Sequence, residues 1–276
     1  LLKPFIPKEK ILKDTFDFVN KIKRLNLPQT SHIVSFDVCS LFTNIPLKDT
    51  IDYILSIIPP NSLPVSHDVL KTLLNLACKD ITFMFDNKLF TQFDGMAMGS
   101  NLGPTMAAFT MSMIEAQINL PSLFYQRYVD DIIAIFDNKN DANNYLQMLN
   151  SIHSKIKFTI EHEKDNKICF LDTIVIKCGS QLMLDFNIKK TNTGSYLHKS
   201  AYSPKTYKNA AIRSLIHRAY RICSNDEYFD KAFNKIQFIF IQNGYHFKYI
   251  EKIKAHTIHS IKEKLQKSEN CLIYVK

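Results

Sequence analysis

The chain contains six cysteines, but no two of them form a C-x-x-C pair. None lies near a histidine at the spacing of zinc ligands, so the pattern excludes the common structural zinc sites. Free thiols in a reducing compartment are therefore the expected state, and a disulfide framework is the less favoured alternative. The sequence also lacks a recognisable signal peptide, internal repeats and low-complexity segments, which excludes repeat proteins and fibrous proteins.

Long apolar runs are scarce as well. The longest uncharged stretch, from Gly95 to Ile114, is long enough to cross a bilayer. Its first half contains three glycines and Pro104, a composition typical of a turn that leads into a helix. The sequence therefore predicts no transmembrane segment and no membrane partner.

The remaining composition is that of a globular protein with an excess of positive charge. Apolar residues make up 46 % and charged residues 22 % of the 276 residues, enough for one large domain or two small ones. Lys and Arg number 35 against 26 Asp and Glu, a net charge of +9. Such an excess favours nucleic acid as the partner. By charge alone an anionic membrane surface is the second choice, and we do not expect it as a partner.

The hydrophobic pattern predicts a mixed α+β core followed by a basic helical region. We expect helices over residues 14–25, 47–58, 66–79, 102–118, 142–153, 207–223, 226–243 and about 249–267. We expect strands over 32–37, 157–163, 168–177 and 182–189, and hairpins over 81–93 and 124–136. Residues 40–46 are expected to form a loop, and the composition changes near residues 191–203.

Acidic residues stand at the ends of two predicted strands. Asp37 ends the first strand, and Asp130 and Asp131 stand at the tip of the hairpin over 124–136. An aspartate at either place is common by itself, because Asp favours turns. In this order, with a glycine-rich turn between them, they favour a site for two Mg²⁺ ions about 3.5–4 Å apart, the arrangement that polymerases use.

Several motifs then resemble one family. Residues 128–131 (YVDD) match the Y-x-D-D box of reverse transcriptases. Residues 36–46 (FDVCSLFTNIP) and 95–104 (GMAMGSNLGP) resemble the first acidic motif and the glycine motif of Penelope-like retroelement reverse transcriptases. The resemblance extends from about residue 14 to residue 245 and is specific as a combination.

The resemblance implies the fold. It implies an α+β right-hand palm, an antiparallel sheet with helices packed on one face, with partial fingers over residues 1–190. A helical thumb and the start of a connector would occupy residues 191–276. Most of the fingers and any GIY-YIG nuclease domain are missing, and the chain begins at Leu1 rather than Met. We therefore expect it to be a piece of a longer protein.

The resemblance also implies an acidic catalytic centre. Asp37 and Asp130 would be the main ligands of two Mg²⁺ ions, with Mn²⁺ as a possible substitute. Asp131 would complete the acidic cluster, and the Val38 carbonyl would be an additional ligand.

Phe42 would lie beneath the sugar of the incoming nucleotide. A bulky ring there leaves no room for a 2′ hydroxyl, which favours dNTPs and disfavours a polymerase that copies RNA into RNA. The alternative is that Phe42 is an ordinary core aromatic.

Other residues would contact the nucleotide. Met98 and Gly99 align with the family's nucleotide-contacting loop, and Gly99 would let the backbone approach the nucleotide because it lacks a Cβ. Asn101 departs from the group's pattern. Lys164 is expected to protonate pyrophosphate, Lys167 competes for that role, and a solvated charge is the alternative for both.

The basic C-terminal region would hold an RNA template and a DNA primer. The residues implied in nucleic-acid binding are Tyr128, Lys199, Lys205, Lys208, Arg213 and Arg218. An ordinary solvated basic face is the alternative. The expected function is that of a retrotransposon's RNA-directed DNA polymerase, acting inside the cell and in the nucleus. A catalytically incomplete or decayed fragment that only binds nucleic acid is the alternative, and no protein partner is indicated.

Overall fold

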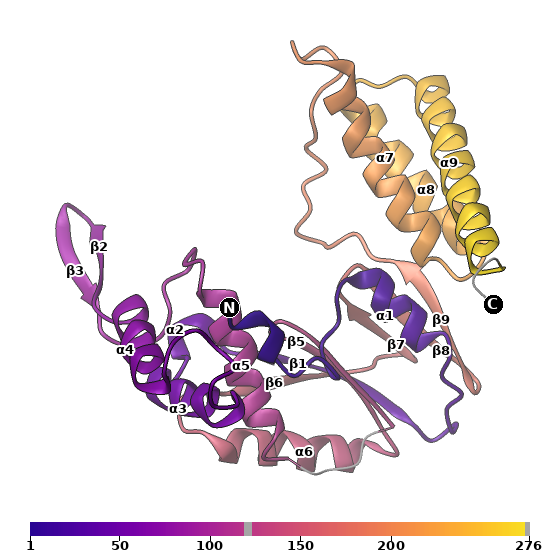
Figure 1. Ribbon diagram of the computed structural model, residues 1–276. Coiled ribbons are helices and arrows are strands. Elements are labelled where there is room, and N and C mark those ends of the chain that lie inside the picture. The colour runs from indigo at the N-terminus through magenta and orange to yellow at the C-terminus, as the bar shows by residue number, and fades with distance from the viewer. Residues whose placement is uncertain (119–122, 274–276) are drawn as a thin grey trace. The chain divides into compact units, whose positions relative to one another are not determined.

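The computed structural model describes residues 1–118 and 123–273, and side chains to residue 264 and at residue 266. The chain forms two compact units, each described here by itself (Figure 1). The first comprises residues 1–14 and 27–164, and the second comprises residues 15–26 and the chain from residue 165 onward. The expected boundary between palm and thumb at residue 190 is a division by function, and it stays a prediction.

The first unit is built on an antiparallel sheet in the order β4-β5-β1-β6. Its strands are β1 (His32–Val38), β4 (Phe124–Tyr128), β5 (Asp131–Phe136) and β6 (Phe158–His162). Strand β1 pairs with β5 on one side and with β6 on the other, and Phe36 lies opposite Ile132 of β5. The first acidic motif and the YVDD box therefore lie on neighbouring strands, although many residues separate them in the sequence.

Helices α3 (Leu47–Ile57), α5 (Gly103–Glu115) and α6 (Lys139–Ile152) share one core with the sheet. Alternate residues of β1, namely Val34, Phe36 and Val38, are buried in this core because successive side chains of a strand point to opposite faces. Helix α5 is buried nearly all round, in keeping with its apolar sequence. The predicted α+β architecture is confirmed, as are the central strand and these helices within a few residues at their ends.

The expected loop over residues 40–46 is wrong in one respect, because it contains the short helix α2 (Leu41–Asn44). Ser40 precedes it in the left-handed region, with φ of 48°. The Thr43 hydroxyl donates to the Ser40 carbonyl at 3.0 Å, and the Asn44 amide donates to the Cys39 carbonyl at 3.1 Å. These side-chain hydrogen bonds close a turn that hydrophobic periodicity does not reveal.

Helix α4 (His67–Cys78) leads into a hairpin of β2 (Ile81–Phe85) and β3 (Lys88–Gln92). Asp86 and Asn87 join the strands with φ of 49° and 56°, as the turn signal predicts. Figure 1 shows the hairpin extending away from the helices beside it. The hairpin is therefore held mainly by its own strand pairing.

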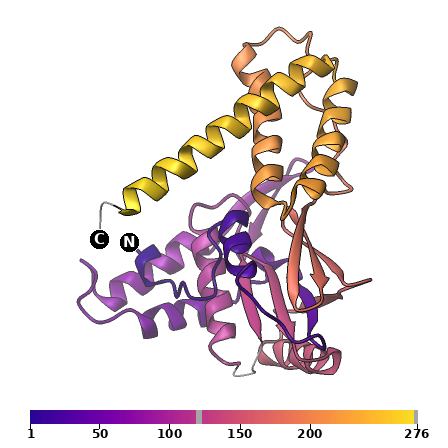
Figure 2. The same ribbon diagram turned by 90° about the vertical axis from the view of Figure 1, so that its right-hand side faces the viewer.

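The second unit combines a small antiparallel sheet with helices. Its elements are α1 (Thr15–Ile22), β7 (Lys167–Phe170), β8 (Thr173–Cys178), β9 (Gln181–Phe186), α7 (Lys205–Ile222), α8 (Asp226–Gln242) and α9 (Phe247–Ile273). The expected single strand over 168–177 is instead two strands, because Leu171 adopts φ of 51° and the chain reverses there. Helices α7, α8 and α9 contact one another, and Figure 2 shows the yellow α9 crossing the other two at an angle.

Two further findings concern the whole described chain. Cys39, Cys78, Cys169, Cys178 and Cys223 are free thiols, and the side chain of Cys271 lies outside the described residues. Over residues 1–118 and 123–273, none of the helices combines the length and the apolar character that crossing a bilayer requires.

Candidate active site

The alternation of β1 brings Asp37 to the side of the sheet opposite the helices. Phe36 is 1 % exposed and points into the core, so its neighbour Asp37 points the other way and is exposed. The pairing of Phe36 with Ile132 sets the register between β1 and β5. Continued by one residue, this register places Asp37 across from Asp131, and both leave the sheet on the same face.

The turn of the YVDD box differs by one residue from the expected tip. Tyr128 pairs with Asp131, so the turn consists of Val129 and Asp130, and Asp131 is the first residue of β5. Val129 has φ of 57°, a left-handed conformation that is rare for a β-branched residue. Such strain is typical of functional turns, and here it occurs directly before Asp130.

Asp37 and Asp130 lie close enough to repel each other. Partial burial raises the pKa of Asp37, and the negative charge of Asp130 raises it further, while a hydrogen bond from the Val38 backbone N–H opposes the shift. A bound cation would relieve this repulsion, and carboxylates are ligands suited to Mg²⁺. The residues thus fit a divalent cation in their chemistry.

The protein side chains supply only part of a coordination sphere. In the part of the chain that the structure describes, no group of three or more His, Cys, Asp or Glu side chains is arranged to hold a metal ion. Magnesium commonly takes one or two carboxylates and completes its shell with water and substrate phosphates. The pair Asp37 and Asp130 is consistent with this kind of magnesium coordination. The expected roles of Asp131 and of the Val38 carbonyl as metal ligands stay predictions.

A buried ion pair supports the turn from within, and sequence reasoning missed it. Arg127 is 1 % exposed, and its Nε and Nη2 donate to the two carboxylate oxygens of Glu115 at 2.7 and 3.3 Å. Its Nη1 donates to the carbonyl of Val129 at 3.0 Å. Arg127 therefore connects helix α5 to the strained residue of the turn. The sequence offered one signal for this ion pair. Arg127 lies inside an apolar strand, and Glu115 is a lone acid at the end of an apolar helix.

The glycine motif is anchored to the helix that carries Phe42. The Met96 N–H donates to the Phe42 carbonyl at 2.7 Å. Gly95 has φ of 73°, and a Cβ there would lie 2.3 Å from the carbonyl oxygen of Thr43, so only glycine fits. The Phe42 ring is half-buried and lies against Gly103, at the start of α5. Phe42 is thus in contact with two parts of the glycine motif, its ring with Gly103 and its carbonyl with Met96.

The predicted nucleotide contacts are open to solvent. Met98 is 76 % exposed, and Gly99 has φ of 94° with no atom within 4 Å of the position of a Cβ. Lys164 and Lys167 are exposed on either side of a turn, the first ending the first unit and the second opening β7. Their roles toward a nucleotide stay predictions.

The predicted nucleic-acid contacts occupy different environments. Tyr128 is 38 % exposed at the end of β4, and Lys205 is exposed at the start of α7. Lys208 is 9 % exposed, and its ammonium donates to the Lys199 carbonyl at 2.7 Å. Lys208 thus already has one partner inside the second unit, and its contact with phosphate stays a prediction.

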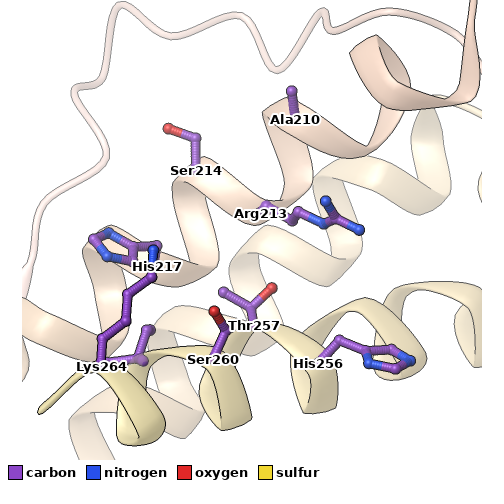
Figure 3. A pocket seen from close by; sticks show the side chains of 9 residues that line it. Ala210, Arg213, Ser214, His217, His256, Thr257, Ser260 and Lys264 are labelled. Carbon is purple, nitrogen blue, oxygen red and sulfur yellow. The ribbon is translucent and has the colours of Figure 1, made fainter. Parts of the chain in front are cut away.

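Two other cations of the second unit lie against an aromatic ring or an acid, and a third lines a pocket. The Lys199 ammonium lies 4.1 Å from the ring centre of Tyr249, and the Arg218 guanidinium pairs with Asp172. Arg213 is exposed and lines a pocket between α7 and α9, which Figure 3 shows from close by.

The sheet order and the helices beside it define a right-hand polymerase fold, and comparison with solved structures agrees. The chain is similar to telomerase from Candida albicans in complex with a TWJ fragment of telomeric RNA (TM-score 0.59, 12 % identity, 88 % of this chain, 44 % of that chain). It is also similar to apo telomerase from Candida tropicalis (TM-score 0.56, 15 % identity, 96 % of this chain, 48 % of that chain). At these identities the likeness concerns the fold, and the chain spans less than half the length of these relatives.

The family follows from the sequence profile. Residues 2–197 match the reverse transcriptase (RNA-dependent DNA polymerase) family, and residues 195–255 match the animal helix-turn-helix domain. The first match covers well over half of the chain, and the chain therefore belongs to the reverse transcriptase family. Reverse transcriptases generally use divalent metal ions. The comparison with curated proteins finds no match.

Proposed function

We propose that this chain is the palm and thumb of a Penelope-like retroelement's reverse transcriptase, which extends a DNA primer on an RNA template in the nucleus. The observation that carries the proposal is the approach of Asp37 to Asp130. Partial burial raises the pKa of Asp37, at the end of β1, and the charge of Asp130, in the turn before β5, raises it further. The motifs of residues 36–46 and 95–104 support the Penelope-like subtype.

Asp37 and Asp130 would hold two Mg²⁺ ions, or Mn²⁺ in their place, with Asp131 and the Val38 carbonyl as further ligands. Such ions, when bound, favour ionisation of the primer hydroxyl and stabilise the charge that develops on the leaving pyrophosphate. The protein contributes the rigid placement of the two carboxylates. Arg127 supports that placement through the Val129 carbonyl, one residue before Asp130.

The nucleotide would lie over Phe42 and the glycine motif. The contacts of the Phe42 ring with Gly103 and of its backbone with Met96 hold it in one position, as a residue that excludes a 2′ hydroxyl must be held. Gly99 leaves open space for the nucleotide, and Met98 offers an apolar surface to its base. These contacts favour dNTPs as the substrate.

The reaction joins the primer 3′ oxygen to the α-phosphorus and breaks the bond from that phosphorus to pyrophosphate. The hydroxyl proton is released, and pyrophosphate takes up a proton as it leaves. Lys164 is the proposed donor, with Lys167 as its competitor, because both are exposed ammonium groups that follow the palm sheet. The basic residues of α7 would hold the phosphates of the template and primer without regard to sequence.

The deciding experiment is primer extension on an RNA template with dNTPs and Mg²⁺ or Mn²⁺. The wild-type chain should extend the primer, and Asp130→Asn should abolish extension while leaving template–primer binding nearly unchanged. Asp137→Asn is the matched control, because Asp137 is an exposed carboxylate just after the far end of β5. Equal activity of the wild-type chain and Asp130→Asn would overturn the assignment.

A second function, binding of template and primer without synthesis, is favoured by two observations. Among the described residues no set of three or more potential metal ligands is assembled, and the chain spans under half of its structural relatives. In this case the chain would bind template–primer but would not extend it under any metal condition. Extension restored by adding the upstream fingers in trans would instead favour the polymerase.

A further inference from the structure

The hairpin of β2 and β3 consists largely of apolar residues that the rest of the first unit leaves uncovered. Four of the five residues in each strand are exposed. Phe83, Met84 and Phe85 are 50 %, 71 % and 70 % exposed, and Leu89 is 71 % exposed. Figure 1 shows the hairpin extending away from α4. Exposed apolar residues that gather on one element indicate a surface of interaction.

The outer edge of β2 is open. Among the described residues, β2 and β3 form a sheet of two strands, so each strand has one edge that faces no other strand. Phe85 and Lys88 flank a two-residue turn and therefore form a hydrogen-bonded pair. Such pairs alternate with non-hydrogen-bonded pairs along an antiparallel ladder. The backbone N–H and C=O groups of Thr82 and Met84 consequently point to the open edge, where another strand can reach them.

The two edges of the hairpin differ in their protection against pairing. Strand β2 has the sequence ITFMF, without charge, proline or glycine. Strand β3 begins with Lys88, and a lysine on an edge strand discourages pairing with another chain. The edge of β2 is therefore the one suited to a further strand, whereas the edge of β3 is suited to end the sheet.

The sequence of β2 is complementary to a second copy of itself. When two β2 strands run antiparallel with Phe83 opposite Phe83 of the second copy, Thr82 lies opposite Met84. Each such pair of Thr82 and Met84 then exchanges both of its hydrogen bonds, because all of these groups face the open edge. Phe83 already stacks on Phe90 with 5.6 Å between ring centres, and the second copy extends this row of aromatic rings. No charged side chain lies within the pairing.

Charge favours a second copy over a nucleic-acid strand at this edge. Residues 79–94 contain two lysines and three aspartates, so the positive excess of the chain lies outside the hairpin. Two copies can therefore meet here without bringing their positive regions together. A nucleic-acid strand can stack bases on phenylalanine, but it also requires cations along its phosphates, and the hairpin supplies few.

We propose that β2 pairs with β2 of a second copy of this chain, which forms an antiparallel sheet in the order β3-β2-β2-β3. Pairing stabilises the hairpin, because two strands alone are marginally stable. The exposed area of the three large side chains of β2 is about 400 Å² in each copy, at about 200 Å² for a whole side chain. This area is small for a specific interface, so the dimer is reversible. The proposal is independent of polymerase activity.

The test is sedimentation velocity of the full chain at about 1–100 µM, over which the wild type should pass from monomer to dimer. Thr82→Pro removes an N–H that faces the open edge and keeps the ladder with β3, because an edge strand tolerates proline there. It should raise the dissociation constant of the dimer about tenfold or more. The matched control is Thr91→Pro. Thr91 lies opposite Thr82, its N–H faces the edge of β3, and its loss should change the dissociation constant by about twofold or less.

A second matched pair of variants tests the side chains. Met84 and Leu89 lie opposite each other in the hairpin and are equally exposed, at 71 %. Met84→Lys places the lysines of the two copies on a diagonal about 7–8 Å apart, and it should weaken the dimer about fivefold or more. Leu89→Lys adds the same charge to β3 and should change the dissociation constant by about twofold or less. Added salt should restore part of the affinity in Met84→Lys but not in Thr82→Pro.

Three results would overturn the proposal. The first is a wild type that stays monomeric up to about 100 µM, whether or not its hairpin binds upstream fingers added in trans. The second is an equal loss in Thr82→Pro and Thr91→Pro, because dimerisation would then depend on the fold of the hairpin rather than on the edge of β2. The third is a mass that keeps rising beyond that of a dimer, which would show open-ended pairing through both edges. Thermal unfolding by circular dichroism checks that every variant folds.

Failure of this inference can be told apart from failure of the proposed function. Asp130→Asn should lose primer extension and dimerise as the wild type does. Thr82→Pro should lose the dimer and keep the primer extension that the wild type shows. A monomeric wild type that extends a primer overturns the dimer alone, and a dimer that never extends a primer overturns the polymerase alone.

Discussion

Arg127 and Glu115 form a nearly dry ion pair, with exposures of 1 % and 7 %, directly beneath the turn that carries Asp130. The pair joins helix α5 to β4, and the third guanidinium nitrogen, Nη1, donates to the Val129 carbonyl. Tyr125 adds a third donor to Glu115 at 2.9 Å. The charge of each partner is thus compensated only by the other and by these fixed dipoles.

Removing Arg127 alone should therefore be costly. Arg127→Met leaves the Glu115 carboxylate buried without its cation, and we expect a loss of about 3–5 kcal/mol in unfolding free energy by urea denaturation. Arg127→Met combined with Glu115→Leu should lose clearly less, because no unpaired charge remains. Equal losses in the single and double variants would contradict this account.

Gly95 and Gly99 offer a matched pair of substitutions. Both have positive φ, but only Gly95 faces backbone at contact distance, with Thr43 oxygen 2.3 Å from the Cβ position. Gly99→Ala should cost about 1–2 kcal/mol from backbone strain. Gly95→Ala should cost about 2 kcal/mol more, because helix α2 must move. Thermal unfolding of the two variants measures the difference, and equal costs would argue against the close packing of α2 on the glycine motif.

Phe42→Ala tests the choice of sugar. If the ring blocks a 2′ hydroxyl, its removal should lower the preference for dNTP over NTP by about tenfold or more in kcat/KM. Phe42→Tyr keeps the ring and should keep the preference. An unchanged preference in Phe42→Ala would assign the ring to packing against Gly103 alone.

The raised pKa of Asp37 predicts how stability responds to pH. A carboxyl that is harder to ionise when folded lowers stability above its folded-state pKa, and this penalty disappears below the unfolded-state pKa of about 3.9. Asp37→Asn should therefore raise the melting temperature at pH 7, and the gain should vanish near pH 4. Asp137→Asn removes an exposed carboxylate that follows the end of β5 away from the turn. It should show no such gain in melting temperature.

Divalent cations should offset the loss of stability that the ionised Asp37 causes at pH 7. Adding Mg²⁺ at pH 7 should raise the melting temperature of the wild type, because the ion binds the folded state. Asp37→Asn should lose most of this response. A wild-type melting temperature indifferent to Mg²⁺ up to millimolar concentrations would contradict a cation site at Asp37 and Asp130.

Much of the palm could be predicted from the sequence because its signals are local. The apolar run of β1, the breakers between helices and the Asp86-Asn87 turn each act within a few residues. Helix α2 and the chain reversal at Leu171 were not predicted, because they lack such local signals. Both depend on residues in the left-handed region, Ser40 and Leu171, and neither serine nor leucine is a residue type that favours this conformation.

The candidate site, too, could be predicted from the sequence only in part. Asp37 and the YVDD box were found by motif, since both stand at strand ends. Arg127 and Glu115 were not paired in advance, because only the packing of α5 against the sheet shows that an arginine in one element meets an acid in another. The pocket between α7 and α9 likewise needs the folded helices, since Arg213 and Lys264 are distant in sequence.

The alternation from Val34 to Val38 in β1 limits which insertions this part of the chain can tolerate. One residue added between Val34 and Phe36 would turn Asp37 into the core and expose the phenylalanine that now fills it. Two added residues would restore the correct face but move the carboxylate about 7 Å along the strand. Length changes should therefore be absent from this strand in active relatives of this chain and should accumulate first in loops such as that over residues 59–65.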